Sequence, residues 1–513
     1  MKYGDLKNSN NQIKYTGKIL ARNTVYNLFG HISPLFVALI AIPYLIDGMG
    51  KERFGVLTMA WIAVGYFSLF DMGIGRATTK FVAEYYAKGY QHKLMGLVKA
   101  SMFLLLGFGI VMGTILAAIT PWLVGDMLNI PEGLQGESAT AFYLLSVSLP
   151  IALIIAGARG VLESQQRFGV INAIRIPASV ATFLIPLMIL PFSNTLIPII
   201  GALVLSRLIA LGFYLSYCYR GLARLGGNAK MEKEYFKQLL SFGGWLTVCN
   251  IIGPLLGSMD RFFIGSLITL SAVVYYATPF DVVTKLFIIP VGIMGVVFPA
   301  FSAFSAGEEE RLDNLHRRTL NYIIATVAPV AACIITFASP LIDMWLGREF
   351  AAQSSLVLQL LAAGVLFSSV TRVAYNAIQA MGRADLPAKL FMIELPIYIG
   401  ILIFVTERFG IVGTAGLWFT RLFIELAIFA VLYKRVSGRK IFKVNYIVIY
   451  FWLIGTLAAA FALSLIPDLY ARIASFVVFL AVFGTLVYVN LFDNYDRLII
   501  KDGISRIKRG RLS

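Results

Sequence analysis

The sequence predicts an all-α polytopic membrane protein. Of its 513 residues, 58% are hydrophobic and only 14% are charged, whereas soluble domains carry roughly 25% charged residues. Mean hydropathy is +0.79, and apolar runs of about 20 residues, the length that crosses the hydrocarbon core, recur along the chain. We therefore expect about fourteen transmembrane helices, arranged as two six-helix bundles plus two C-terminal helices.

The expected spans follow one another with short connections. In chain order they are residues 24–46, 54–75, 99–124, 139–161, 173–192, 196–217, 238–267, 271–304, 319–342, 354–381, 390–406, 410–433, 446–466 and 472–492. The first apolar run is too long for a signal-peptide core, so we expect a retained first span. Internal Pro and Gly in several spans favour kinks that neighbouring helices must compensate.

Weak internal similarity supports the division into two bundles. Leu162–Phe168, after the fourth span, resembles Ile378–Ala384, after the tenth, with the same spacing from the aliphatic residue to the Arg. Similar stretches six spans apart indicate a parallel repeat. The expected parts are a cytoplasmic N-terminus 1–23, a first bundle 24–217, a cytoplasmic linker 218–237, a second bundle 238–433, helices 13 and 14 within 446–492, and a basic cytoplasmic tail 493–513.

Lys and Arg gather in every other loop, which sets the orientation of the chain. By the positive-inside rule both termini are then cytoplasmic. The net charge of +17 has the same origin, and because no basic stretch carries a nucleic-acid motif, no nucleic acid is expected as a partner. The three cysteines lack metal-ligand spacing, so no metal site is expected. Segments 76–98 and 493–513 are amphipathic. Segment 76–98 either continues the second span or lies along the cytoplasmic surface, and surface anchoring is the favoured interpretation of both segments.

The chain carries no motif of a known enzyme class. It lacks the phosphate-binding G-x-x-x-x-G-K-[ST], the G-x-S-x-G elbow, H-E-x-x-H and the Rossmann fingerprint. No cofactor is expected. The outward loops are too short for a catalytic domain, which argues against the alternative of a membrane glycosyltransferase or polymerase.

Ionisable residues inside the apolar spans are the informative set. A charge at membrane depth costs between about 3 and 10 kcal/mol, so each needs a partner or a water-filled cavity. They are Asp71, Arg207, Asp260, Arg261, Asp281, Lys285, Arg372, Glu394, Arg421 and Glu425. This set predicts a polar path through a helical bundle, and so a transporter.

Spacing separates these residues into two kinds. Asp281/Lys285 and Arg421/Glu425 are four apart and share a helix face, so each is either a self-neutralised pair or part of the path. Arg207 and Arg372 have no acidic neighbour one turn away and need a partner from another helix or an anionic ligand. Guanidinium groups suit a diphosphate because they bind phosphate oxygens bidentately. Asn27, in the first span, either bonds sugar hydroxyls or joins helices.

Several motifs together resemble a known family. They are Phe54-Gly-Val-Leu, Leu69-Phe-Asp-Met-Gly-Ile-Gly-Arg76, Met259-Asp-Arg-Phe-Phe-Ile-Gly265, Ala272-Val-Val-Tyr-Tyr276 and Asn376-Ala-Ile-Gln-Ala-Met-Gly-Arg383. They resemble the polysaccharide-transporter branch of the multidrug/oligosaccharidyl-lipid/polysaccharide (MOP) exporter superfamily, the flippases of O-antigen and related repeat units. The resemblance implies alternating access around a central cavity and a lipid-linked oligosaccharide on undecaprenyl diphosphate as cargo. It places Arg22, Arg76 and Arg261, with Asp260 beside them, at the diphosphate.

The resulting expectation is an ion-coupled flippase in the bacterial cytoplasmic (inner) membrane. Its expected substrate-binding residues are Arg22, Asn27, Arg76, Arg207, Asp260, Arg261, Lys285 and Arg372, and its ion-coupling residues are Asp71, Asp281, Glu394 and Glu425, with H⁺ or Na⁺ as the coupling ion. Its expected partners are the cargo, membrane lipids and other polysaccharide-assembly proteins. The alternatives are a multidrug/cation antiporter of the same fold and a lipid II flippase.

Overall fold

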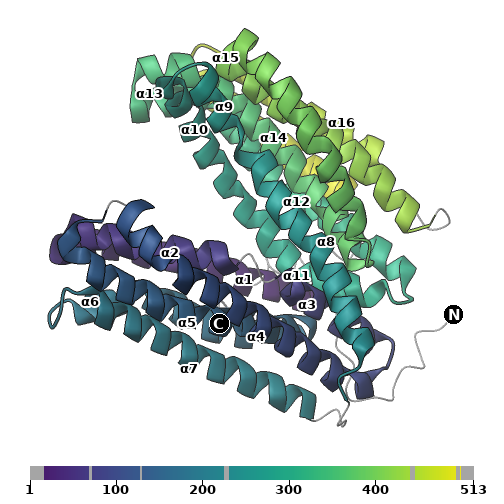
Figure 1. Cartoon of the computed structure of the whole chain (residues 1–513). Coiled ribbons are helices and arrows are strands. Elements are labelled where there is room, and N and C mark those ends of the chain that lie inside the picture. Colours follow the sequence, from purple (N-terminus) through teal and green to yellow (C-terminus); the bar gives the residue numbers. More distant parts are fainter. Residues whose placement is uncertain are drawn as a thin grey trace, which may run out of the picture. The chain divides into compact units, whose positions relative to one another are not determined.

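The computed structural model describes residues 17–68, 72–127, 130–223, 230–438, 445–492 and residue 497. Within these ranges the regular elements are all helical (Figure 1). The α-helices are α1 Gly17–Met49, α2 Lys51–Ser68, α3 Ile74–Ala87, α4 Gln91–Trp122, α5 Glu132–Ser164, α6 Phe168–Ile189, α7 Leu196–Ala223, α8 Lys233–Ser258, α9 Asp260–Leu267, α10 Leu270–Thr284, α11 Ile288–Phe304, α12 Glu309–Thr336, α13 Ala338–Leu346, α14 Arg348–Ala380, α15 Asp385–Val436, α16 Tyr446–Ser464 and α17 Leu469–Leu486. The short elements are π-helical η1 Leu123–Met127 and η3 Val487–Leu491, and 3₁₀-helical η2 Lys285–Phe287.

The membrane-spanning pattern agrees with the sequence prediction. In the described ranges, 11 helical segments are long and apolar enough to cross a membrane. One of them, α15, holds two of the expected spans, because Gly410 interrupts it with φ 61° and ψ −152°. The first expected span lies in α1, and the second, residues 54–75, begins in α2 and ends in α3. The all-α polytopic fold class with about fourteen spans is confirmed.

The chain divides into two compact units, which are described separately. The first unit comprises Met1–Ile252, Gly295–Gly307 and Gln379–Lys389. The second comprises Gly253–Met294, Glu308–Ile378 and Leu390–Ser513. The C-terminal part of α11 and the turn after α14 therefore belong to the first unit.

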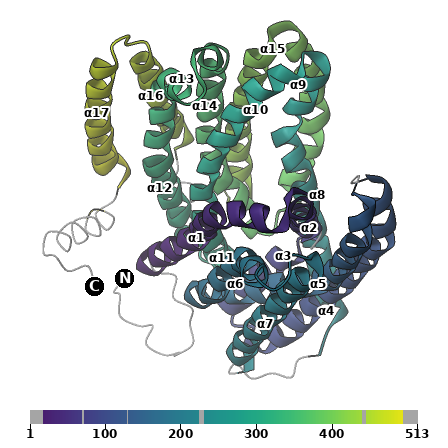
Figure 2. The same cartoon turned by 90° about the vertical axis from the view of Figure 1, so that its left-hand side faces the viewer.

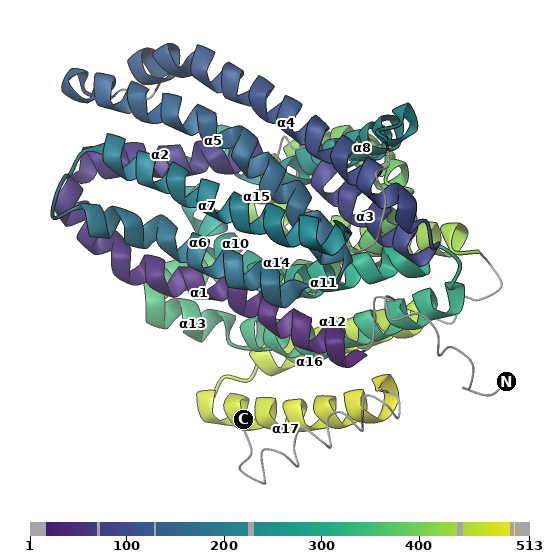
Figure 3. The ribbon, with the colours of Figure 1, turned by 90° about the horizontal axis from the view of Figure 1, so that it is seen from below.

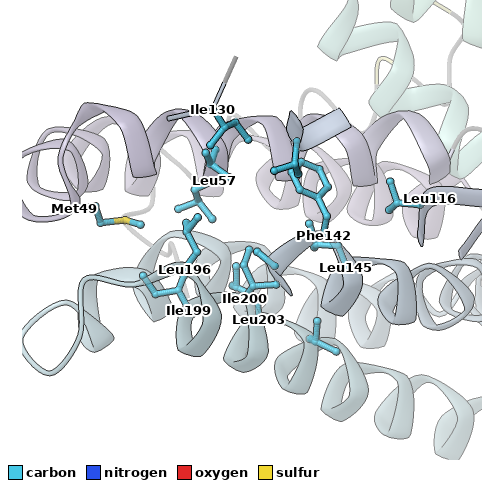
Figure 4. Close-up of a cluster of buried hydrophobic side chains, with 14 of the residues drawn as sticks. Met49, Leu57, Leu116, Ile130, Phe142, Leu145, Leu196, Ile199, Ile200 and Leu203 are labelled. Carbon is cyan, nitrogen blue, oxygen red and sulfur yellow. The ribbon is translucent and has the colours of Figure 1, made fainter. Parts of the chain in front are cut away.

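Helix α5 is central to the packing of the first unit. It lies against α2, α3, α4 and α7 (Figure 2). Glycines allow α4 to approach α5 closely, since a Cβ at Gly109 would stand 2.4 Å from the Cα of Pro150. Helix α1 runs beside α6 (Figure 3). Leu57, Phe142 and Leu196 meet in a buried apolar cluster (Figure 4).

The amphipathic segment after the second span contains helix α3. Ile74, Ala77 and Val82 are buried, and α3 packs on α4 and α5. This buried face makes α3 an integral part of the first unit. The segment was interpreted from the sequence as a surface anchor, and α3 instead has one face packed in the helical bundle.

In the second unit, α12 packs against α16 and also contacts α17 (Figure 2). Helix α17 lies along α16 (Figure 3). Thr336 of α12 donates a hydrogen bond to the carbonyl of Ala460 in α16 at 3.3 Å. The two C-terminal spans are thus attached to the second unit through α12.

The two similar turn sequences adopt the same local conformation. After α5, Gln166 has φ 57°, and after α14, Gly382 has φ 85°. The amide of Gln166 donates to the carbonyl of Glu163 at 2.9 Å, and the amide of Gly382 donates to the carbonyl of Gln379 at 2.8 Å. Each left-handed residue directly precedes the Arg of its stretch.

Candidate functional site

Asp260 lies at the centre of a buried polar cluster in the second unit. It is the first residue of α9, directly after the break that ends α8, and it is 0% exposed. Tyr276 of α10 donates its hydroxyl to Oδ2 at 2.5 Å, and Tyr398 of α15 donates to Oδ1 at 2.7 Å. An ionised carboxylate only accepts hydrogen bonds, so two hydroxyl donors are the arrangement that suits it.

Arg421 joins this carboxylate to two more. Its Nη1 lies 3.3 Å from Oε1 of Glu394 and 3.9 Å from Oε2 of Glu425. Its guanidinium carbon lies 5.2 Å from the ring centroid of Tyr398, the same ring whose hydroxyl binds Asp260. The side chains of Arg421, Glu394 and Glu425 are 11%, 16% and 11% exposed. We call the group of Asp260, Tyr276, Glu394, Tyr398, Arg421 and Glu425 the acid cluster.

The acid cluster carries more acids than bases. Its three carboxyl groups face the guanidinium of Arg421, and Arg372 acts electrostatically on Glu425 from outside the cluster, so full ionisation would still leave the acids in excess. Buried charge without compensation is strongly unfavourable. Within the described part of the chain, Oε2 of Glu394 is buried and has no hydrogen-bond partner. Chemically, the cluster is arranged to take up a proton or a small cation.

Arg261 points away from its neighbour Asp260, as adjacent residues on a helix must. It donates from Nη2 to Oδ1 of Asp281 at 2.6 Å and lies 4.7 Å from the ring centroid of Phe280. The Asp281 side chain is 61% exposed. Exposed ion pairs contribute about 0–1 kcal/mol, so an incoming ligand can displace Asp281 from Arg261 at little cost.

The sequence left open a self-neutralised Asp281/Lys285 pair. Asp281 instead pairs with Arg261, and Lys285 is exposed. The physical reason is local, because α10 ends at Thr284 and Lys285 begins the 3₁₀ element η2, which changes the angular spacing of the side chains. The other pair, Arg421/Glu425, is present at 3.9 Å, but Glu394 lies nearer to the guanidinium.

Arg207 and Arg372 have no acidic neighbour one turn away on their own helices, and each meets a group from elsewhere in its unit. Arg207 of α7 donates to Oγ of Ser148 in α5 at 2.9 Å. Arg372 of α14 stacks over the ring of Phe287, 4.4 Å from its centroid. A cation over an aromatic face is stabilised by the ring quadrupole.

In the first unit, Arg76 of α3 is half-buried. Its Nη1 donates to Oε1 of Gln379 at 3.2 Å, and its guanidinium carbon lies 5.0 Å from the ring centroid of Phe298. Arg22 is exposed on α1. Asp71, expected to couple an ion, lies outside the described residues.

Asn27 of α1 is buried at a helix junction. Its carbonyl accepts a hydrogen bond from Nη2 of Arg175 at 3.0 Å, and Arg175 also donates to Oδ1 of Asn172 at 2.7 Å. A Cβ at Gly295 would stand 2.8 Å from Nδ2 of Asn27, so α1 packs closely here. These contacts favour the helix-joining role over a sugar contact.

Tyr276 and Tyr398 are the residues that sequence reasoning missed. A signal for Tyr398 existed, because it lies four residues after Glu394 and so shares its helix face. Tyr276 stood out in the sequence only as the end of the motif Ala272-Val-Val-Tyr-Tyr276. Its hydroxyl reaches Asp260 because α9 and α10 pack together, which no local pattern reveals.

Comparison with known proteins decides the family. A family model described as "Polysaccharide biosynthesis protein" matches residues 49–355, more than half of the chain. The chain belongs to this family. A candidate O-antigen transporter of Shigella flexneri is 28% identical over 419 residues, covering 82% of this chain and 99% of the relative. A candidate low-salt glycan biosynthesis flippase of Haloferax volcanii is 25% identical over 199 residues, covering 38% of this chain and 42% of the relative.

The solved structures that share this fold include transporters. A MATE transporter of Vibrio cholerae in its bent form has a TM-score of 0.69 at 16% identity, covering 82% of this chain and 96% of that one. A MOP superfamily transporter of Pyrococcus furiosus has a TM-score of 0.64 at 14% identity, covering 86% of this chain and 96% of that one. The resemblance to the O-antigen flippase branch of the MOP superfamily is thereby confirmed. The protein is a multi-pass membrane protein of this family, and the relatives and solved structures named here are described as transporters or flippases and not as enzymes.

Proposed function

We propose that this protein is a flippase that moves an undecaprenyl-diphosphate-linked oligosaccharide across the bacterial cytoplasmic membrane by alternating access. The observation that carries the proposal is the similarity to the candidate O-antigen transporter, which extends over 99% of that relative. The basic residues in alternate loops place both termini in the cytoplasm in this proposal.

Arg261 and Arg76 are the proposed contacts to the diphosphate. Arg261 holds only one exposed carboxylate, Asp281, and a diphosphate offers more charge and more oxygens than that partner. The guanidinium of Arg76 is oriented by its hydrogen bond to Gln379 and by the ring of Phe298. Both arginines are thus suited to bind an anion.

Proton uptake by the acid cluster is the proposed coupling step. Glu394 is the proposed site because its Oε2 is buried without a hydrogen-bond partner in the described part of the chain. A proton there would leave two carboxylates of the acid cluster, Glu425 and Asp260, to act on Arg421. Sodium is the alternative coupling ion, and replacing a proton gradient by a sodium gradient separates the two.

The test is flipping of a fluorescent undecaprenyl-diphosphate oligosaccharide in liposomes that contain the purified full-length protein. We expect protein-dependent flipping that Arg261→Ala abolishes while Arg408→Ala, at an exposed arginine, leaves it intact. Full activity of Arg261→Ala would reject its role. Uptake of a cationic dye without flipping would favour the drug antiporter, and flipping of lipid II alone would identify that cargo.

Coupling is tested in the same liposomes by imposing a pH gradient. We expect the gradient to accelerate flipping by the wild type. Glu394→Gln should flip without responding to the gradient, whereas Glu407→Gln, at an exposed site, should respond as the wild type does. A gradient response in Glu394→Gln equal to that of the wild type would exclude Glu394 as the coupling group.

A further inference from the structure

The first unit contains a basic cavity that the proposed transport path does not use. The cavity has a volume of about 440 Å³ and lies between α3, α8 and the residues around the start of α15. Sites for small molecules occupy roughly 300–1,000 Å³. Its lining includes Lys80, Phe242, Trp245, Arg383, Asp385 and Lys389, and we call it the basic pocket.

Lys80, in one wall of the basic pocket, shares an acid with a second lysine, and that acid and that lysine lie outside the lining. Oε2 of Glu84 lies 2.5 Å from Nζ of Lys80, and its Oε1 lies 2.5 Å from Nζ of Lys88. One carboxylate therefore faces two ammonium groups. The Lys80 side chain is only 7% exposed, and burial lowers its pKa despite the attraction of Glu84. A further anion beside Lys80 would balance the second positive charge, which the single carboxylate of Glu84 leaves uncompensated.

The opposite wall repeats the arrangement. Asp385 accepts hydrogen bonds from Arg383 at 2.9 and 3.2 Å and from Nζ of Lys389 at 3.2 Å. The ammonium of Lys389 also lies 5.4 Å from the ring centroid of Trp245. Each wall thus keeps one positive charge in excess, and the Arg383 and Lys389 side chains are 51% and 56% exposed, so both remain accessible to a ligand.

The frame around the basic pocket is fixed by contacts between its elements. Tyr85 of α3 donates its hydroxyl to Gln238 of α8 at 3.0 Å. Phe81 and Phe242 meet edge to face, with ring centroids 5.6 Å apart. The lining cations therefore stand on a preformed support, which lowers the entropic cost of binding.

Gly382 brings its turn close to Lys80. A Cβ at this position would stand 3.2 Å from Nζ of Lys80, and the φ of +85° also favours glycine. In the equivalent turn after α5 the corresponding residue is Gln166, whose side chain donates to the carbonyl of Val296 at 3.1 Å. In the turn after α5 the Gln166 side chain fills the space, whereas in the turn after α14 Gly382 has no side chain and leaves space beside the ammonium of Lys80.

We propose that the basic pocket binds the phosphate of an anionic phospholipid headgroup, with the glycerol portion against Trp245. Lys and Arg together are the usual phosphate ligands. The sequence places these basic loops on the cytoplasmic side, where anionic lipids attract clustered Lys and Arg, and Trp is enriched at the membrane interface. Free phosphate has the same anionic chemistry, but it would not make use of the aromatic wall.

The test measures binding to the full-length protein in detergent, with no transport cargo present. Phosphatidylglycerol is titrated in mixed micelles, with phosphatidylcholine as the neutral comparison and inorganic phosphate as the competitor. We expect saturable binding of phosphatidylglycerol alone. Arg383→Gln combined with Lys389→Gln should weaken it about tenfold or more, since hydrogen bonds to charged groups are strong. Arg435→Gln, an exposed arginine outside the pocket, should bind as the wild type does.

A variant that is expected to tighten phosphatidylglycerol binding distinguishes a lost contact from a folding defect. Asp385→Asn removes the one acid that lines the pocket and should tighten phosphatidylglycerol binding, an outcome that misfolding cannot produce. Equal binding of the two lipids, or weaker binding by Asp385→Asn, would overturn the proposal. Saturable displacement by inorganic phosphate at the lipid's own affinity would assign the site to a soluble phosphate instead. Because the assay contains no cargo, its result is independent of flipping.

Discussion

Replacing Arg421 by Met should destabilise the second unit strongly. Met keeps much of the side-chain volume but removes the guanidinium that faces Glu394 at 3.3 Å and Glu425 at 3.9 Å. Both carboxyl groups would then lie in an apolar setting without their cation. Either they ionise without compensation or they bind protons, and both outcomes cost free energy of folding.

The size of the effect follows from these distances. At an effective dielectric constant of about 20, each pair contributes an attraction of about 4 to 5 kcal/mol, which is an upper limit because desolvation opposes it. Breaking a buried ion pair by removing one partner costs about 3–5 kcal/mol. We expect Arg421→Met to fall in that range, and Arg408→Met, at an exposed site, to change stability by less than about 0.5 kcal/mol.

The assay is thermal unfolding of the purified protein in detergent at pH 7, compared through a double-mutant cycle. Adding Glu394→Gln to Arg421→Met should restore part of the lost stability, because one stranded carboxyl is removed. The reasoning would be refuted if Arg421→Met melted with the wild type. A double variant less stable than Arg421→Met would refute it as well, since Glu394 would then not depend on the guanidinium.

Three further predictions follow from single contacts. Tyr276→Phe removes one donor to buried Asp260 and should cost about 1.5–3 kcal/mol in thermal unfolding, and no change would mean that this hydroxyl does not stabilise the carboxylate. Gly410→Ala should cost about 1–3 kcal/mol in the same assay because of the φ of 61°, and an unchanged melting temperature would exclude strain there. Burial raises the pKa of Glu84, but attraction and hydrogen bonding from Lys80 outweigh it, so the folded pKa lies below 4.5. The contribution of Glu84 to the free energy of unfolding is therefore present above pH 4.5 and is lost as pH falls through the folded pKa. Glu84→Gln should be less stable than the wild type at pH 7 and approach the stability of the wild type under acid. A stability difference between the two proteins that does not change with pH would contradict this.

Hydropathy alone predicted most of the fold because the bilayer limits the alternatives to spanning helices of fixed length. The separation of the spans 390–406 and 410–433 is an example. The helix α15 runs through both, 52 residues in all, and Gly410 with its left-handed φ turns the chain between them. The sequence carried that signal as the charged residues Glu407 and Arg408 directly before Phe409 and Gly410.

The partners of the buried charges were not predictable in the same way. Periodicity tells which residues share a face of one helix, but not which helix that face meets. Tyr398 reaches Asp260 across 138 residues of sequence, and Ser148 reaches Arg207 across 59. Where an i, i+4 pair was visible, at Asp281 and Lys285, the change from α-helix to 3₁₀ helix altered the register.

The basic pocket was likewise not predictable from the sequence, because it depends on contacts between separate elements. Lys80, Arg383 and Lys389 were visible as members of basic loops, but loops of like charge need not meet. They converge because α3 packs into the first unit through its apolar face and because the turn at Gly382 approaches Lys80. Both contacts depend on tertiary packing, which composition cannot specify.

The two charge clusters have opposite sign and belong to different compact units. The acid cluster, with Asp260 and Arg421, lies in the second unit, and Arg76 with the basic pocket lies in the first. An acid and a base placed about 4 Å apart at an effective dielectric of about 20 attract each other by about 4 kcal/mol, which would occupy both. In the proposed flippase each cluster would bind its own ligand, a cation in the acid cluster and an anion in the basic pocket or at Arg76. In the proposed flippase the two ligands would then influence one another through the conformations that each favours, and this coupling must be equal in both directions.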